Sequence, residues 1–165
     1  MNISILQICL ISLFYCFSNI SWPFGSMGPW ATINRPLVGG LVVGLILGNP
    51  VQGTIIGATI NVIYLGLVSA GGSLPADSGM AGIMGTTFAL IGGLDTNTAL
   101  ALAVPMGLVG AVNEVLTMTG QCMLIPLADK WIEQGKSKLV IWANTWIPYI
   151  VKSIIRFIIV FVILY

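Results

Sequence analysis

Residues 37–57 read "LVGGLVVGLILGNPVQGTIIG", two apolar runs separated by Gly48, Asn49 and Pro50. The run before this break is much shorter than the roughly 20 residues that a helix needs to span a bilayer. Helices interrupted by glycine and proline, with their ends inside the membrane, are typical of secondary transporters. The stretch therefore predicts a half-helix or a re-entrant piece followed by a second helix.

Glycines recur at every fourth position on both sides of this break, at Gly40, Gly44 and Gly48 and again at Gly53 and Gly57. Small residues at this spacing form a flat stripe that lets two helices approach closely. We interpret the stripe as tight packing between helices, or between subunits of an oligomer, and not as a binding site.

The same organisation continues along the whole chain. Apolar runs at 3–20, 51–70, 80–93, 98–119 and 140–165 alternate with breakers such as "GGSLPADSG" (71–79) and "LDTN" (94–97). Hydrophobic residues make up 57% of the 165 residues and charged residues 7%, where a soluble domain carries about 25% charged residues. The sequence predicts an all-α, polytopic membrane protein with short broken or re-entrant helices, and a single transmembrane domain over residues 1–165.

Several functions are excluded or disfavoured by composition. The chain has no histidine, which removes histidine-based catalysis, histidine metal ligands and phosphohistidine chemistry. Its net charge of +1 gives no indication of nucleic-acid binding. Its three cysteines lie in apolar runs at spacings that fit no metal site, so we expect no cofactor and no metal.

Two end segments complete the topology. No basic residue precedes the apolar run 3–20 and no small-residue cleavage site follows it, so we interpret this run as a retained segment and not as a cleaved signal peptide. Residues 129–138 form an aqueous loop whose lysines place it in the cytoplasm by the positive-inside rule.

Asp77 is the first candidate site residue, since it is the carboxylate of the loop at 71–79. A carboxylate accepts hydrogen bonds from sugar hydroxyls, and the neighbouring Ser73 and Ser78 add donors. The loop is either an ordinary exposed turn with a solvated aspartate or a re-entrant tip that lines a cavity.

Asn61 is the second candidate, because helical spacing puts it on the same side as Gly53 and Gly57. An amide inside the membrane needs a partner, which is either a neighbouring helix or a polar solute. Glu114 lies in an apolar run and is costly to bury, so it either faces a cavity or pairs with Lys152 or Arg156, which share one face of the last segment.

The blocks "RPLVGGLVVGLILGNPVQGTIIGATINVIYLGLVSAGG", "PADSGMAGIM", "ALALAVP" and "ADKWIEQG" resemble, in this order, the membrane permease component IIC of the mannose-type sugar phosphotransferase system. The resemblance implies a cell inner-membrane, multi-pass subunit that binds and translocates a hexose-like sugar. It further implies a membrane partner, IID, and cytoplasmic partners IIA and IIB, whose histidines carry the phosphate. IIC has no phosphorylation site of its own. By analogy, Asp77 would contact the sugar, with Asn61 close to it.

The chain departs from the family pattern at three positions. Asn49 and Asn61 stand where the family usually has carboxylates, and Ala111 stands where a glutamine is common. Family members also continue past residue 165 with further membrane segments. Two alternatives therefore stay open: a truncated, non-transporting membrane subunit or scaffold, and an unrelated transporter with re-entrant loops.

Overall fold

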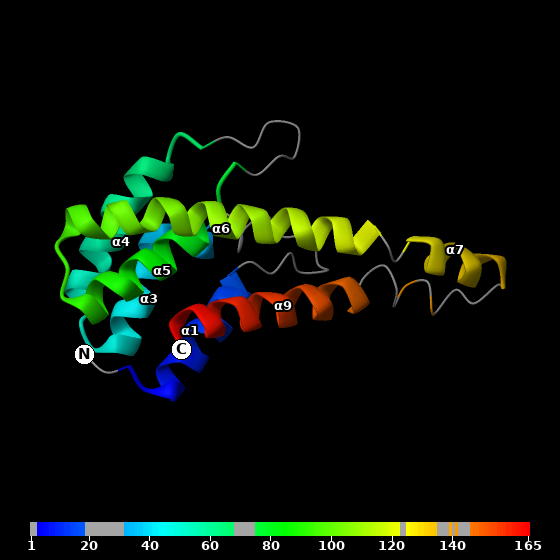
Figure 1. Cartoon of the computed structure of the whole chain (residues 1–165), viewed down its shortest axis with the longest axis horizontal. Helices are drawn as coiled ribbons and strands as arrows, with labels where there is room; N and C mark the ends of the chain where they lie inside the picture. The colour runs from blue at the N-terminus through cyan, green and yellow to red at the C-terminus, as the bar shows by residue number, and fades with distance from the viewer. Residues whose placement is uncertain are drawn as a thin grey trace.

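The computed structural model describes residues 3–18, 32–67, 75–122, 125–134, 139, 141 and 146–165. Every element within these ranges is a helix, which confirms the predicted all-α fold (Figure 1). The described helices between residues 5 and 92 gather at one end of the molecule, and the short helix at 125–133 lies at the other. The long helix α6 (Thr96–Cys122) runs from this bundle towards the opposite end, and α9 (Ile147–Leu164) lies along it.

Helices α3 (Pro36–Leu47) and α4 (Pro50–Tyr64) form the broken pair that residues 37–57 predict. Gly48 ends α3 in the left-handed conformation with φ 81°, which a side chain would make costly. Asn49 then caps α4 by accepting a hydrogen bond from the backbone of Gln52, and Pro50 occupies the first turn. At 1.5 Å per residue, α3 is about 18 Å long, which is too short to cross a bilayer.

The glycine stripe packs α3 against α4 at backbone contact. A Cβ atom on Gly40 would lie 2.5 Å from the carbonyl oxygen of Gly53, and one on Gly44 would lie 2.9 Å from Cα of Pro50. The predicted close packing is thus confirmed for these positions. It is wrong for Gly48, where an added Cβ would meet no atom within 4 Å, because this glycine serves the turn instead.

Helix α5 (Ser78–Gly92) lies at the centre of the bundle, against α3, α4 and α6. Small residues on α5 let the neighbouring helices pack closely against it. A Cβ on Gly82 would lie 2.4 Å from Cα of Pro36, and one on Gly85 would lie 2.8 Å from Cβ of Ala103. Gly93 ends α5 with φ 60°, and Asp95 begins α6 by accepting a hydrogen bond from the backbone of Thr98 at 3.4 Å.

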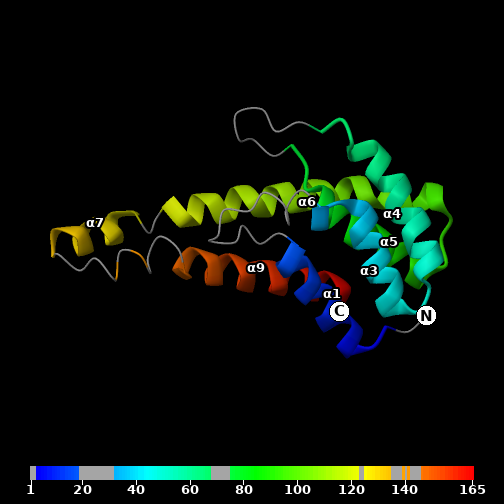
Figure 2. The same ribbon diagram turned by 180° about the vertical axis from the view of Figure 1, so that it is seen from behind.

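The first and last described helices pack together. Helix α1 (Ile5–Ser18) lies against α9 and touches α3 and α5 (Figure 2). The core that these helices share is apolar and is built from Ile8, Ile11, Tyr15, Val43, Leu47, Met80, Ile83, Met84, Val160 and Leu164.

The outer surface is also apolar, as a chain in lipid requires. Leu108, Val112 and Leu116 on α6 and Ile158 and Val162 on α9 are exposed. Within the described residues, α6 and α9 are the two helices that are long and apolar enough to cross a membrane, and α1, α3 and α5 are shorter apolar helices.

The aqueous loop predicted at 129–138 is partly wrong. Residues 129–133 belong to a helix, α7 (Ile125–Glu133), which extends beyond the end of α6 (Figure 1). Its apolar and charged residues alternate with helical period, a pattern that also stabilises helices at a water interface. Residues 135–138 lie outside the described part of the chain.

Candidate functional site

The start of α5 carries Asp77, and its side chain caps the helix. Oδ1 of Asp77 accepts a hydrogen bond from the backbone N–H of Met80 at 3.1 Å, which satisfies one of the amides that every helix leaves open at this end. The backbone N–H of Asp77 donates to the carbonyl oxygen of Gly107 on α6 at 2.9 Å. The residue is only 2% exposed, so the alternative of a solvated loop aspartate is wrong.

Tyr15 of α1 holds the other oxygen of this carboxylate. Its hydroxyl donates to Oδ2 of Asp77 at 2.7 Å, and both side chains are buried. Hydrogen bonds to an ionised carboxylate are short and roughly twice as strong as those between neutral groups. This contact joins α1 to the start of α5 across 62 residues of sequence.

Two glycines bring neighbouring segments onto Asp77. A Cβ on Gly110 of α6 would lie 2.5 Å from Cβ of Asp77 and 2.8 Å from Cβ of Met80. A Cβ on Gly79 would lie 1.9 Å from Oδ1 of Asn34, in the turn that precedes α3, and 3.3 Å from Oδ1 of Asp77. The carboxylate therefore lies where α1, α5, α6 and the start of α3 meet.

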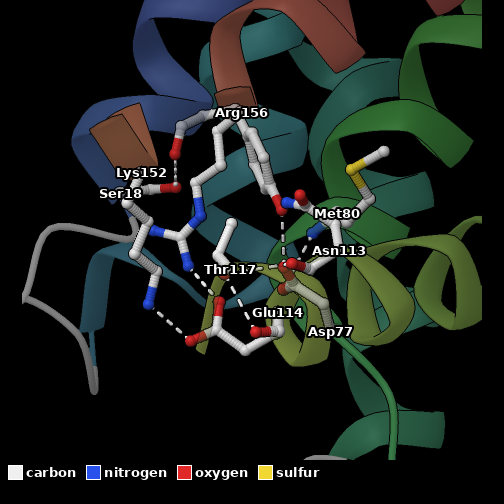
Figure 3. A network of polar contacts seen from close by, with 9 residues as sticks. Ser18, Asp77, Met80, Asn113, Glu114, Thr117, Lys152 and Arg156 are labelled. Atoms are coloured by element: carbon white, nitrogen blue, oxygen red, sulfur yellow. Dashed lines mark hydrogen bonds and ion pairs between the residues drawn. The ribbon is translucent and has the colours of Figure 1, made fainter. Parts of the chain in front are cut away.

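A second charged group follows one turn further along α6. Glu114 forms ion pairs with both Lys152 and Arg156 of α9, as Figure 3 shows. Thr117 donates its hydroxyl to the backbone carbonyls of Asn113 and Glu114, at 3.0 and 2.9 Å. The predicted pairing of Glu114 is confirmed, and it involves both cations at once. Together with Asp77, the cluster has two negative and two positive side chains inside an apolar body.

The other predicted site residues are placed differently from one another. Ser78 is half-buried and donates to the backbone carbonyl of Asn34 at 3.5 Å, towards α3. Oδ1 of Asn61 on α4 is buried and has no hydrogen-bond partner among the described residues. Ser73 lies outside the described residues.

Sequence reasoning missed Tyr15 and Asn34 at this site. Tyr15 is the one tyrosine of segment 3–20, and this was a signal because a buried tyrosine hydroxyl needs a partner. Asn34 gave a weaker signal, since an asparagine before a proline-initiated helix is common in turns.

Two surface grooves lie beside α9. The larger, of about 640 Å³, is apolar and runs between α1, α3 and α9, with Leu13, Phe14, Val42, Ile46 and Ile150 in its lining. The smaller, of about 130 Å³, lies between α6 and α9 next to Lys152. Neither groove is lined by Asp77 or Asn61.

Broken helices packed through glycines, an apolar outer surface and a buried charged centre are features of an integral membrane protein. A sequence model of the family "PTS system sorbose-specific iic component" matches residues 5–165. The chain belongs to this family, which confirms the resemblance to mannose- and sorbose-type IIC components.

Individual relatives agree with this assignment. The chain is 32% identical over 144 residues to the sorbose-specific EIIC component of Lacticaseibacillus casei, covering 87% of this chain and 50% of that protein. It is 30% identical over 144 residues to the mannose-specific EIIC component of Escherichia coli K12, covering 87% of this chain and 53% of that protein. The chain thus spans about half the length of the curated relatives it matches.

A solved structure has the same fold. The chain superimposes with a TM-score of 0.84 and 26% identity on a chain from a cryo-EM structure of the mannose transporter ManYZ in complex with microcin E492. The match covers 99% of this chain and 64% of that chain.

Proposed function

We propose that this chain is the sugar-binding and sugar-translocating membrane component, IIC, of a mannose-type phosphotransferase system. Residues 1–165 would form one transmembrane domain in a cell inner membrane, crossing it several times. Family membership supports the proposal, and the coverage of about half of each relative makes the activity of the whole protein part of the proposal.

The observation that carries the proposal is the burial of Asp77. A carboxylate that is 2% exposed within an apolar bundle is costly unless polar groups compensate it. Two fixed donors, the Tyr15 hydroxyl and the Met80 amide, hold this carboxylate in one orientation. A carboxylate held in this way suits the binding of sugar hydroxyls, and Asn61, Ser73 and Ser78 are the further binding residues that we propose.

The chain would act with partners. It has no histidine, so phosphate would pass through histidines of IIA and IIB and reach the sugar after IIC and the second membrane subunit, IID, have bound it. The segment that contains Lys130, in helix α7, and Lys136 and Lys138 after it would face the cytoplasm, where IIA and IIB act.

The test is sugar uptake driven by phosphoenolpyruvate, in cells that lack their own mannose-type system and express this chain with IIA, IIB and IID. Asp77→Asn keeps the size of the side chain but removes the charge and leaves one acceptor oxygen for the two donors, the Tyr15 hydroxyl and the Met80 amide. We expect uptake to fall at least about tenfold, the effect of roughly 1.4 kcal/mol of lost binding. Asp95→Asn is the matched control, because Asp95 also caps a helix but is exposed.

Normal uptake by Asp77→Asn at wild-type protein levels would contradict the assignment of the site. Copurification of the wild-type chain with IID without any uptake would instead favour the non-transporting alternative.

A further inference from the structure

Three asparagines on three different segments have buried side-chain oxygens without a hydrogen-bond partner among the described residues: Asn34 before α3, Asn61 on α4 and Asn113 on α6. Asn34 is 7% exposed and Asn113 is 4% exposed. Most buried polar side-chain atoms in proteins have a partner, because an unsatisfied one is destabilising. Three such oxygens in one region of a small bundle therefore need an explanation.

Asn34 lies next to the first turn of α5, where Asp77 caps the helix. Its Oδ1 is the atom that a Cβ on Gly79 would approach most closely, and the same Cβ would lie 3.3 Å from Oδ1 of Asp77. The amide oxygen and the carboxylate thus flank the same glycine in the first turn of α5.

Asn113 approaches from α6. It lies three residues after Gly110, so the two share one face of that helix. A Cβ atom on Gly110 would meet the Cβ atoms of Asp77 and Met80. This face of α6 is therefore turned to the start of α5.

Asn61 is brought to the same level by the glycine stripe. The close pairs of α3 and α4 are Gly44 with Gly53 and Gly40 with Gly57, so each step of four residues along one helix matches four along the other. A Cβ on Gly57, one turn before Asn61, would lie 2.6 Å from the carbonyl oxygen of Pro36, so the same register continued by one turn brings Asn61 towards the start of α3. Pro36 is two residues from Asn34, and it contacts Gly82, one turn into α5.

We propose that the amide oxygens of Asn34 and Asn113, with that of Asn61, extend the Asp77 site into a sugar-binding site made of hydrogen-bond acceptors. The inference rests on the proposed function and adds two binding residues to it. An amide oxygen and an ionised carboxylate only accept hydrogen bonds. Each of these buried amide oxygens therefore needs a donor from the bound group, as the hydroxyl of a sugar provides, while the amide NH2 groups remain available to donate.

The experiment separates a ligand role from a structural one by measuring stability and affinity together. The full chain is purified in complex with IID, and the dissociation constants of D-mannose and D-glucosamine are measured by calorimetry. Asn113→Leu and Asn34→Leu each replace a side chain whose amide oxygen is buried and unsatisfied by an apolar side chain of similar length. Removing an unsatisfied buried polar atom does not lower stability, whereas a bound sugar hydroxyl loses its acceptor.

We expect both variants to keep or raise the melting temperature without sugar and to raise the dissociation constant of the bound neutral or amino sugar about tenfold. Thr86→Val is the control. Oγ1 of Thr86 is also buried without a partner among the described residues, but it lies nine residues beyond Asp77, about 13 Å along α5. This variant should keep its affinity.

Unchanged sugar affinity in Asn34→Leu and Asn113→Leu, or a lowered melting temperature in both, overturns the inference and leaves the proposed function standing. If the wild-type complex binds none of these sugars while it remains folded, the proposed function fails together with the inference.

Discussion

Replacing Glu114 by Gln tests how α9 is held to the bundle. The substitution removes the one carboxylate that pairs with both Lys152 and Arg156, and leaves two cations four residues apart on one helix face. The Arg156 side chain is only 3% exposed, so its charge cannot be compensated by water. Breaking a buried ion pair by removing one partner typically costs about 3–5 kcal/mol, and we expect a loss in this range.

Lys152→Gln provides the matched comparison. It removes the cation whose side chain is 19% exposed and leaves Glu114 and Arg156 as a neutral pair. The loss is then closer to that of one charged hydrogen bond, about 1.5–3 kcal/mol at most. A triple variant, with Gln at 114, 152 and 156, leaves no unpaired charge and should recover part of the stability lost in Glu114→Gln.

The assay is the free energy of unfolding in detergent, from sodium dodecyl sulfate titrations followed by circular dichroism. We expect Glu114→Gln to lose the most free energy of unfolding and Lys152→Gln to lose the least, with the triple variant between them. If Glu114→Gln is no less stable than Lys152→Gln, the buried charges do not hold α9 and the reasoning is wrong.

Three further predictions concern packing and capping. Gly40→Ala should lower the free energy of unfolding by about 1–3 kcal/mol, because backbone blocks the new Cβ, whereas Gly120→Ala, with open space around it, should not destabilise. Gly107→Ala should destabilise because its Cβ would lie 2.4 Å from the Tyr64 hydroxyl, and the double variant with Tyr64→Phe should recover stability in the same titrations. The hydrogen bond from Thr98 lowers the pKa of Asp95 below its ordinary value of 3.8. Amide protection at the start of α6 should therefore be highest above that value and fall as pH drops through the lowered pKa, and this pH dependence should disappear in Asp95→Ala; a flat pH profile in the wild type would contradict this.

The elements that the sequence predicted correctly are those with strong local signals. The break at 48–50 follows from residues that end one helix and start the next, whatever surrounds them. The pairing of Glu114 was predictable for a different reason. In an apolar medium a buried charge needs an opposite one, and Lys152 and Arg156 were the cations within the apolar segments.

The site itself was only partly predictable. Asp77 could be singled out as a carboxylate between apolar runs, but its contact with Tyr15 depends on how α1 lies against α5, which no local pattern specifies. The unsatisfied oxygens of Asn34 and Asn113 are likewise a property of the assembled bundle. Residues 129–133 were expected in a loop because they are polar, although polar residues at helical spacing also fit a helix end at the membrane surface.

The position of Glu114 has a consequence for how the protein is made. The two cations that neutralise it are synthesised 38 and 42 residues later, on α9. Until the ribosome has delivered them, a lone carboxylate on α6 would enter hydrocarbon at a cost of about 2.5–3.5 kcal/mol, judged from acidic residues at the centre of inserting helices. Lateral exit of α6 from the translocation channel is thus favoured once α9 has arrived. If the two helices leave the channel together, Glu114 enters the hydrocarbon already paired with Lys152 and Arg156.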